Sequence, residues 1–150
     1  MKKAFLFPGQ GSQFIGMGQE LASQFEVAKD VFSEIDEALG ERLSKLMFRG
    51  DIEELTLTKN AQPAIMAVSI AILRVMSSNG LNLKTIDLLA GHSLGEYSAL
   101  VCSASLEFKD AVYLLHERGK AMQKAVPVGK GKMIAVLGTK IKKQANSCIV

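Results

Sequence analysis

The segment Gly-His-Ser-Leu-Gly at residues 91–95 has the form G-x-S-x-G, which is typical of a serine that acts as a nucleophile. The pattern indicates catalysis only where a strand precedes the turn and a helix follows it. Here the apolar residues 86–90 precede it and a helix-forming stretch over residues 96–103 follows it. We therefore expect Ser93 to stand at the end of a sheet, with the backbone N–H of Leu94 placed to stabilise an oxyanion. The alternative is a plain strand-to-helix turn.

A serine nucleophile needs a base, and the chain contains two histidines. His116 falls on the polar side of a helix predicted over residues 108–126, near Lys120, so we expect a solvated surface residue. His92 directly precedes Ser93, and neighbouring side chains in such a turn point apart. We expect His92 to buttress the turn and to contribute to substrate binding there. Neither histidine fits the role of the base.

The predicted helix over residues 108–126 carries a cation on its apolar side. Arg118 lies there between Leu115 and Met122, where an unpaired guanidinium would be costly to bury. One alternative is an internal Asp or Glu as its partner, or a side chain that reaches out to water. The other is a carboxylate on the substrate, held by two parallel hydrogen bonds. The helix pattern leaves both open, and the neighbouring serine favours the substrate.

A glycine-rich loop over residues 9–18 follows the first apolar run. A dinucleotide-binding loop would require glycine at position 14, where Phe14 stands, and no Walker-type Gly-Lys-Ser/Thr sequence occurs. Because the loop follows a strand, we expect it at the same end of the sheet as Ser93. The backbone N–H of Gln10 is then a candidate second oxyanion donor. The alternative is a simple flexible turn.

Strands and helices alternate along the chain, which predicts an α/β fold with a parallel sheet. Short apolar runs predict three buried strands, at residues 3–7, 86–90 and 132–137. Helical spacing of apolar residues predicts four helices, at residues 21–39, 60–76, 96–103 and 108–126. Three strands make a thin sheet, so we expect an incomplete domain.

The composition argues against several classes of protein. The chain has 150 residues, 48% hydrophobic and 22% charged, with a net charge of +3, as in an ordinary globular protein. Its basic residues are scattered, which argues against nucleic-acid binding. Cys102 and Cys148 lack metal-ligand spacing, so we expect no metal and no disulfide scaffold. The apolar run over residues 64–73 is about half the length of a membrane span. We therefore expect a cytoplasmic protein without a membrane partner.

Four segments together resemble the malonyl-CoA:acyl-carrier-protein transacylases, which load malonyl groups for fatty-acid biosynthesis. They are FPGQGSQ at 7–13, Gln62-Pro63, AGHSLGEYSAL at 90–100 and RGKAMQKAVP at 118–127. The resemblance covers nearly the whole chain in order and spacing, and it weakens after Gly138. It implies that Ser93 is the nucleophile and that the N–H groups of Gln10 and Leu94 form the oxyanion hole. It also implies that Arg118 binds the malonyl carboxylate and that Gln62 lines the pocket.

The resemblance also implies a fold and its division. Residues 1–128 would form part of an α/β-hydrolase-like parallel-sheet core, and residues 129–150 would begin an inserted ferredoxin-like subdomain. In the family the catalytic histidine follows that insert, so we expect a truncated, N-terminal portion with weak or no activity of its own. The resemblance implies no cofactor, with malonyl-CoA as substrate and acyl carrier protein as acceptor.

Two other functions stay open at this stage. A serine esterase or thioesterase would pass the acyl group to water and would tolerate neutral acyl chains. A non-catalytic module would bind acyl-CoA or carrier protein without forming a covalent adduct. Replacing Arg118 tests the first alternative, and a malonyl adduct on Ser93 would exclude the second.

Overall fold

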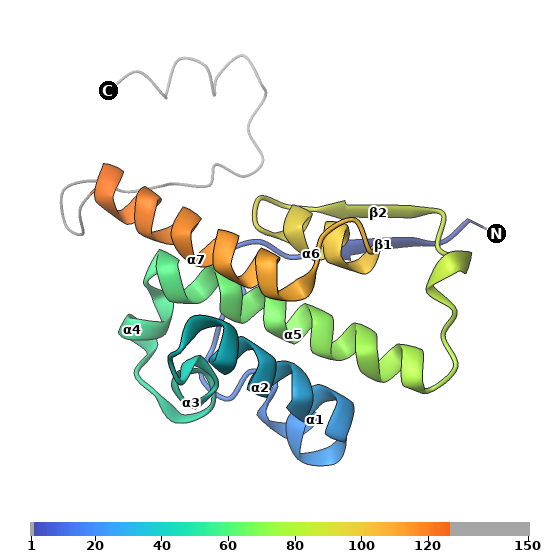
Figure 1. Ribbon diagram of the computed structural model, residues 1–150, viewed down its shortest axis with the longest axis horizontal. Helices are drawn as coiled ribbons and strands as arrows, with labels where there is room; N and C mark the ends of the chain where they lie inside the picture. Colours follow the sequence, from blue (N-terminus) through green and yellow to red (C-terminus); the bar gives the residue numbers. More distant parts are fainter. Residues whose placement is uncertain (1, 127–150) are drawn as a thin grey trace, which may run out of the picture.

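A computed structural model of the chain describes residues 2–126 (Figure 1). The elements follow one another as β1 (Ala4–Phe7), α1 (Gln19–Gln24), α2 (Glu26–Leu39), α3 (Leu43–Arg49), α4 (Ile52–Thr56), α5 (Thr58–Ser78), the 3-10 turn η1 (Leu83–Thr85), β2 (Leu88–Gly91), α6 (Gly95–Cys102) and α7 (Phe108–Ala125). The strand predicted at residues 132–137 and the predicted subdomain over 129–150 lie outside the described residues.

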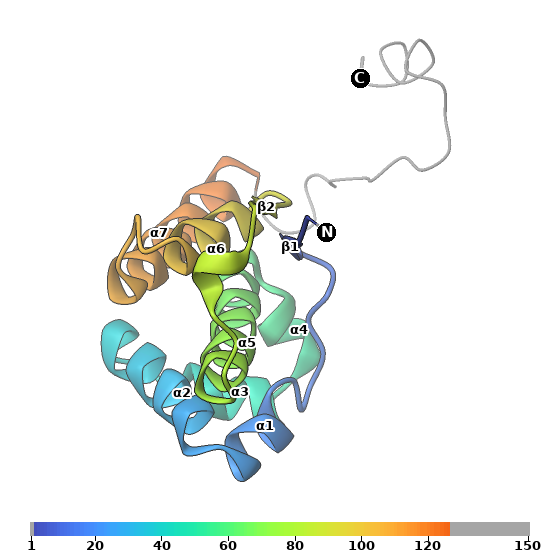
Figure 2. The same ribbon diagram turned by 90° about the vertical axis from the view of Figure 1, so that its right-hand side faces the viewer.

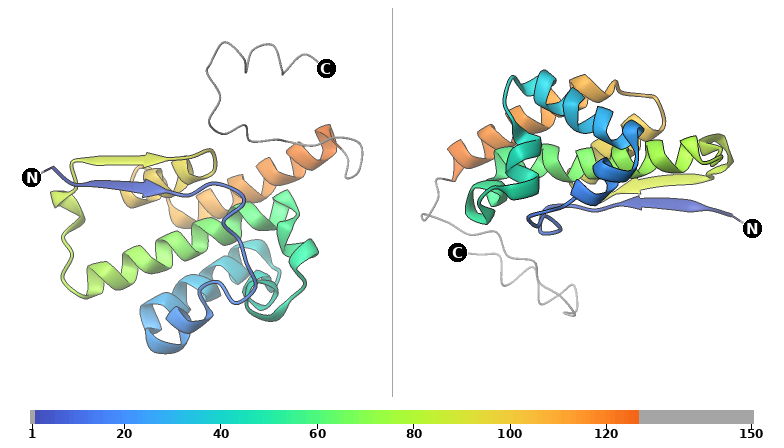
Figure 3. Two further views of the ribbon diagram at one scale, coloured as in Figure 1. Left: turned by 180° about the vertical axis from the view of Figure 1, so that it is seen from behind. Right: turned by 90° about the horizontal axis from the view of Figure 1, so that it is seen from below.

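The two strands form a parallel pair, as predicted, with Phe7 opposite Gly91. Figure 3 shows them running side by side in the same direction. Helix α6 packs against both strands and lies between them and α7 (Figure 2). Because the last residues of the two strands are paired, the loops that follow them start at the same edge of the sheet. The glycine-rich loop and the serine turn are therefore neighbours, as expected from the sequence.

Helix α5 forms the centre of the packed helices. It packs against α2, α6 and α7, and most of its side chains are buried. Its length and composition alone would allow it to cross a membrane, but 67% of the relevant window is buried inside the fold. An apolar helix that is covered by other helices of the same chain is the ordinary core helix of a folded domain.

The first half of the chain differs from the sequence prediction in two places. The helix predicted over residues 21–39 is two helices, because Phe25 adopts an extended conformation between α1 and α2. Half-buried Phe25 packs against the core there, so tertiary packing overrides the helical spacing. Helices α3 and α4 were not predicted. The second has a local signal, since Asp51 accepts hydrogen bonds from the N–H groups of Glu53 and Glu54.

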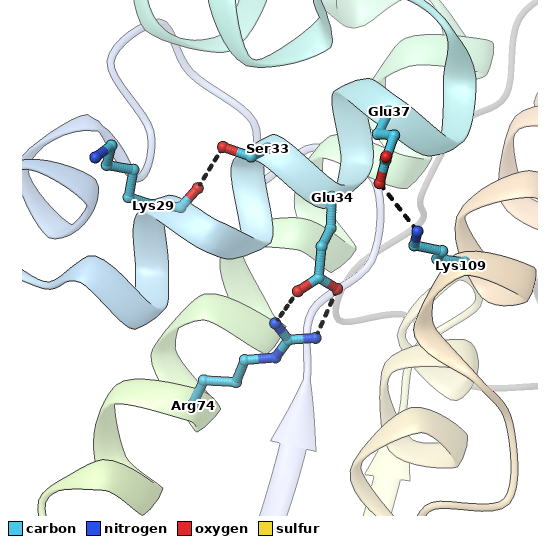
Figure 4. Close-up of polar contacts among 6 residues, drawn as sticks. All are labelled: Lys29, Ser33, Glu34, Glu37, Arg74 and Lys109. Carbon is cyan, nitrogen blue, oxygen red and sulfur yellow. Dashed lines mark hydrogen bonds and ion pairs between the residues drawn. The ribbon is translucent and has the colours of Figure 1, made fainter.

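Ion pairs join α2 to α5 and α7 (Figure 4). Arg74 on α5 binds Glu34 on α2 through both guanidinium nitrogens, with Nη2 2.9 Å from Oε2. Lys109 on α7 reaches Glu37 on α2 at 2.9 Å. The hydrogen bonds from Arg74 lower the pKa of Glu34 below its ordinary value of 4.5, although partial burial opposes this effect. The Arg74 guanidinium also lies 5.4 Å from the centre of the Phe108 ring.

We expect the Glu34–Arg74 pair to make folding stability depend on acid. Because folding lowers the pKa of Glu34, its contribution is present above pH 4.5 and is lost as the pH falls below that value. Glu34→Gln should lower the free energy of unfolding at pH 7 by about 0.5–1 kcal/mol. It should also make the loss of stability below pH 4.5 shallower. Urea unfolding at several pH values measures both effects.

Glu26→Gln is the matched control for this prediction. Glu26 also pairs with a cation, Lys29, but the two side chains are 72% and 60% exposed. Its replacement should change the free energy of unfolding by less than about 0.5 kcal/mol. Equal effects of the two substitutions would contradict the role assigned to Glu34.

Candidate active site

Ser93 occupies a strained turn between β2 and α6. Its φ is 55°, in the left-handed region that residues other than glycine rarely adopt, and its side chain is exposed. A Cβ built on Gly91 would lie 1.9 Å from the carbonyl carbon of Gly95. A Cβ built on Gly95 would lie 2.4 Å from the carbonyl oxygen of Phe7. Both glycines are therefore required by close backbone approach, and the turn has the form expected of a nucleophile elbow.

We expect Gly91→Ala and Gly95→Ala to destabilise the chain strongly. Each new Cβ would collide with backbone atoms that cannot move without displacing a strand or a helix, at a cost of about 3 kcal/mol or more. Gly80→Ala is the control, because Gly80 has a φ of 96° but open space around it. Its strain alone should cost about 1 kcal/mol. Thermal or urea unfolding compares the three variants, and similar losses in all of them would refute the steric explanation.

Arg118, Ser93 and Gln62 form a continuous hydrogen-bonded group. Nη2 of Arg118 donates to Oγ of Ser93 at 3.0 Å, and Nη1 donates to Oε1 of Gln62. The fully buried Gln62 directs its Nε2 to the sulfur of Met122 at 3.3 Å, which fixes the orientation of its amide. Residues from α5, α7 and the serine turn, which are far apart in sequence, thus meet at one point.

The partner of Arg118 was left open by the sequence. Within residues 2–126, the ion pairs involve other residues, and no Asp or Glu lies within salt-bridge distance of this guanidinium. Its hydrogen-bond acceptors, Gln62 and Ser93, are both neutral. A half-buried guanidinium with neutral acceptors beside an exposed serine is suited to bind an incoming anion. The alternative of an internal carboxylate partner finds no support in the described part of the chain.

The glycine-rich loop lies against the serine turn. Its shape is held by local hydrogen bonds, from Ser12 Oγ to the carbonyl of Gly9 at 3.0 Å and from the N–H of Gly11 to Oε1 of Gln13 at 2.8 Å. Gln10 is half-buried, and its Nε2 reaches Thr58 Oγ1 on α5 at 3.4 Å. Hydrogen bonds thus hold the loop together and join it to α5. A simple flexible turn would not be expected to have both kinds of contact.

The two residues beside Ser93 differ in their surroundings. The N–H of His92 donates to the carbonyl of Phe7 at 3.0 Å, which extends the pairing of the strands. Its ring lies against the loop, because a Cβ on Gly9 would lie 2.4 Å from Nδ1. This is the contact of a residue that supports the turn. The Leu94 side chain is fully buried, and its backbone leads into the first turn of α6. The positive end of the α6 helix dipole therefore lies beside Ser93.

His116 does not lie where the sequence placed it. The prediction of a solvated surface residue is wrong, because the side chain is 5% exposed and Nδ1 lies 3.1 Å from the carbonyl oxygen of Lys59. The projection of a single helix places a residue relative to its own neighbours only. It could not show that the first turn of α5 covers this side of α7. That His116 is not the base for Ser93 stays a prediction.

Among the described residues, the surroundings of Ser93 suit a nucleophile better than those of the thiol of Cys102. Among residues 2–126, no three His, Cys, Asp or Glu side chains are grouped to hold a metal ion. Cys102 is half-buried, and burial raises the pKa of its thiol above 9.0, which disfavours the reactive thiolate. Ser93 is instead exposed, with a cationic donor on its oxygen and a helix N-terminus beside it.

Comparisons with known proteins point to one family. The family described as acyl transferase domain matches residues 4–149. The chain is 59% identical over 137 residues to the malonyl CoA-acyl carrier protein transacylase of Bacillus subtilis (strain 168), covering 91% of this chain and 42% of that protein. It is 47% identical over 149 residues to the protein of the same name from Haemophilus influenzae, covering 99% of this chain and 47% of that one.

Solved structures agree with the sequence relatives. The acyl-carrier-protein-S-malonyltransferase of Bartonella henselae superposes with a TM-score of 0.93 at 53% identity, over 99% of this chain and 48% of that one. A malonyl-transacylase solved in complex with a type II PKS acyl-carrier protein superposes with a TM-score of 0.80 at 48% identity, over 85% of this chain and 40% of that one. The chain spans less than half the length of these relatives. With the elbow at Ser93 and the family match over residues 4–149, the chain belongs to the acyl transferase domain family.

Proposed function

We propose that the chain carries the acyl-binding half of a malonyl-CoA:acyl-carrier-protein transacylase. The observation that supports this most directly is the hydrogen-bonded group of Ser93, Arg118 and Gln62, which combines a nucleophile with a guanidinium whose two acceptors are neutral. An esterase for neutral acyl chains would have no use for a guanidinium at this point. The names of the relatives support the same activity.

The reaction would proceed in two acyl transfers. Ser93 Oγ attacks the thioester carbonyl of malonyl-CoA and loses its proton to a base. The carbon–sulfur bond then breaks, and CoA leaves as a thiol after protonation. The phosphopantetheine thiol of acyl carrier protein next attacks the seryl ester and restores the serine. Each transfer exchanges one acyl bond for another, so no cofactor is needed beyond the substrate.

Arg118 would bind the carboxylate at the far end of the malonyl group. Its guanidinium can present two parallel N–H groups to a carboxylate, and the bound substrate would replace Ser93 as one of its acceptors. Gln62 would keep its bond to Nη1 and hold the guanidinium in plane. The arginine would thus select acyl groups with a free carboxylate and place the thioester carbonyl near Ser93.

The oxyanion of each tetrahedral intermediate would be stabilised by backbone donors. We assign this role to the N–H groups of Gln10 and Leu94, because the glycine-rich loop lies against His92, the residue before Ser93, and α6 begins directly after Leu94. His92 would support the loop from below through its contact with Gly9. The base that accepts the serine proton would come from a part of the family domain that this chain does not include.

We also propose a cytoplasmic location and acyl carrier protein as the protein partner. One relative is described in complex with its acyl-carrier protein. The net charge of +3 is in keeping with an acidic partner and with the phosphates of CoA.

Intact-mass measurement of the chain after incubation with malonyl-CoA tests the proposed function. We expect a malonyl adduct that peptide mapping places on Ser93 and that does not form on the Ser93→Ala variant. Addition of holo acyl carrier protein should remove the adduct and transfer it to the carrier. The incubation must be long enough for a reaction about 10²–10⁴-fold slower than in a full-length relative, because the base is missing. Failure to form any adduct over that time, with the chain folded, would refute covalent catalysis at this serine and favour a non-catalytic binding module.

A further inference from the structure

The first turn of α5 contains a residue, Lys59, whose two backbone polar groups lack partners within their helix. Its N–H is one of the first donors of the helix, and the N-cap residue is Leu57, whose side chain accepts no hydrogen bond. Its carbonyl would ordinarily accept from the N–H four residues later, but that residue is Pro63, which has none. Because Lys59 is half-buried, both groups need partners from elsewhere.

Helix α7 supplies both of these partners. The N–H of Lys59 donates to Oε1 of Gln123 at 2.9 Å. The carbonyl oxygen of Lys59 lies 3.1 Å from Nδ1 of His116. Since a carbonyl oxygen can only accept, Nδ1 must carry the proton in this contact. His116 thus supplies the donor that Pro63 lacks, and Gln123 supplies the cap that Leu57 cannot.

Gly119 allows the two helices to meet at this point. His116, Gly119 and Gln123 are spaced by three and four residues, so they share one face of α7. A Cβ on Gly119 would lie 2.4 Å from Cα of Lys59 and 2.6 Å from its nitrogen. The backbones of α5 and α7 are therefore in contact between the two side-chain hydrogen bonds, where α7 runs across the beginning of α5 (Figure 1). We name this contact the Lys59 clamp.

The Lys59 clamp lies next to Arg118, which donates to Ser93, and next to Gln62, which accepts from Arg118. Gln62 is one turn after Lys59 on α5, and Arg118 is adjacent to Gly119 on α7. The hydrogen bond between Gln62 and Arg118 spans the same two helices. We infer that His116 and Gln123 are positioning residues that fix the first turn of α5 on α7 and thereby hold Arg118 for recognition of the substrate carboxylate. The carboxylate part of this inference rests on the proposed function, whereas the positioning of the guanidinium does not.

Paired variants separate positioning from packing. His116→Leu removes the donor to Lys59, whereas His116→Asn retains a nitrogen donor near the place of Nδ1. Gln123→Met keeps the length of the side chain without its acceptor. Gln123→Glu keeps the acceptor and adds a negative charge that a helix N-terminus favours. Glu117→Gln is the control on the same helix, because Glu117 makes an exposed ion pair with Lys120.

Pro63→Ala tests the proposed reason for the His116 contact. An alanine at this position would offer its own N–H to the Lys59 carbonyl within the helix. His116→Leu should therefore lower the free energy of unfolding less in the Pro63→Ala background than in the unsubstituted chain. The effects of the two substitutions would then be non-additive. Additive effects would contradict the explanation.

The experiment uses the 150-residue chain labelled with ¹⁵N. We expect His116→Leu and Gln123→Met to speed water exchange of the Arg118 guanidinium protons about tenfold or more, as local order is lost. His116→Asn and Gln123→Glu should restore slow exchange, and Glu117→Gln should not change it. In the same variants, the ratio of Ser93 acylation by malonyl-CoA to that by acetyl-CoA should fall about 10- to 100-fold where the clamp is broken.

Two results would overturn the inference. One is a folded clamp variant whose Lys59 amide exchanges faster while Arg118 exchange and the acylation ratio stay unchanged, which would make the contact structural only. The other is failure of both conservative variants to restore Arg118 exchange. If the unsubstituted chain shows no preference for malonyl-CoA, the proposed function is wrong instead. Arg118 exchange still decides in that case whether His116 and Gln123 position the guanidinium.

Discussion

Arg118→Ala should abolish the preference of Ser93 for malonyl-CoA over acetyl-CoA. Two charged hydrogen bonds to the malonyl carboxylate would be lost, worth about 3–4 kcal/mol together, so the ratio of the two acylation rates should fall about 10²–10³-fold. The rate with acetyl-CoA should stay the same or rise, because the acetyl group makes no use of the guanidinium. Initial rates of adduct formation by mass spectrometry, at several concentrations of each thioester, give both values.

Two variants make this result specific to the guanidinium at this point. Lys120→Ala removes an exposed cation from the same helix and tests whether general attraction of the extra negative charge on the malonyl group explains the preference. It should leave the ratio unchanged. Arg118→Lys keeps the charge but not the planar pair of N–H groups, so the ratio should fall only in part. A ratio that survives Arg118→Ala would favour a serine esterase or thioesterase that tolerates neutral acyl chains.

Short sequence patterns were sufficient to predict the parts of the site that depend on the local backbone conformation. The spacing of Gly91 and Gly95 around Ser93, between an apolar run and a small-residue helix, was sufficient to predict the turn. The structure explains this success, because neither glycine has room for a Cβ. The order of strand and loop likewise predicted that Gln10 would lie at the same end of the sheet as Ser93. Such features can be predicted from the sequence because they depend on residues that are close together in it.

Features that depend on contact between distant helices were predicted less well. Arg118 was recognised as out of place on an apolar face, but the structure was needed to show that Gln62 and Ser93 accept its hydrogen bonds. His116 was misplaced, because its surroundings come from the first turn of α5 and not from its own helix. A signal was present in Pro63, which leaves the carbonyl of Lys59 without a donor. Pro63 therefore indicates that the Lys59 carbonyl needs a hydrogen-bond donor from elsewhere, but it does not indicate which helix provides that donor.

Acylation of Ser93 in the 150-residue chain should be about 10²–10⁴-fold slower than in a full-length transacylase, the range contributed by a general base. The chain has two histidines, and within residues 2–126 neither makes a hydrogen bond to Ser93 Oγ, whose partner there is Arg118. His116 uses Nδ1 on the carbonyl of Lys59, and the ring of His92 faces Gly9 in the neighbouring loop. The Bacillus subtilis relative, 59% identical over the shared region, is the reference enzyme for side-by-side assays.

The pH dependence of Ser93 acylation tests whether a missing histidine base is the reason that the reaction is slow. Without a histidine base, the rate should rise with hydroxide concentration through neutral pH and show no plateau, because the small fraction of ionised serine limits attack. His92→Gln should leave the shape of the pH profile unchanged, whereas Arg118→Ala should reduce the rate with malonyl-CoA at every pH. A rate that levels off as the pH rises, and that no longer does so in His92→Gln, would make His92 the base. Rates equal to those of the full-length relative would contradict the assignment of the base to a part of the domain outside this chain.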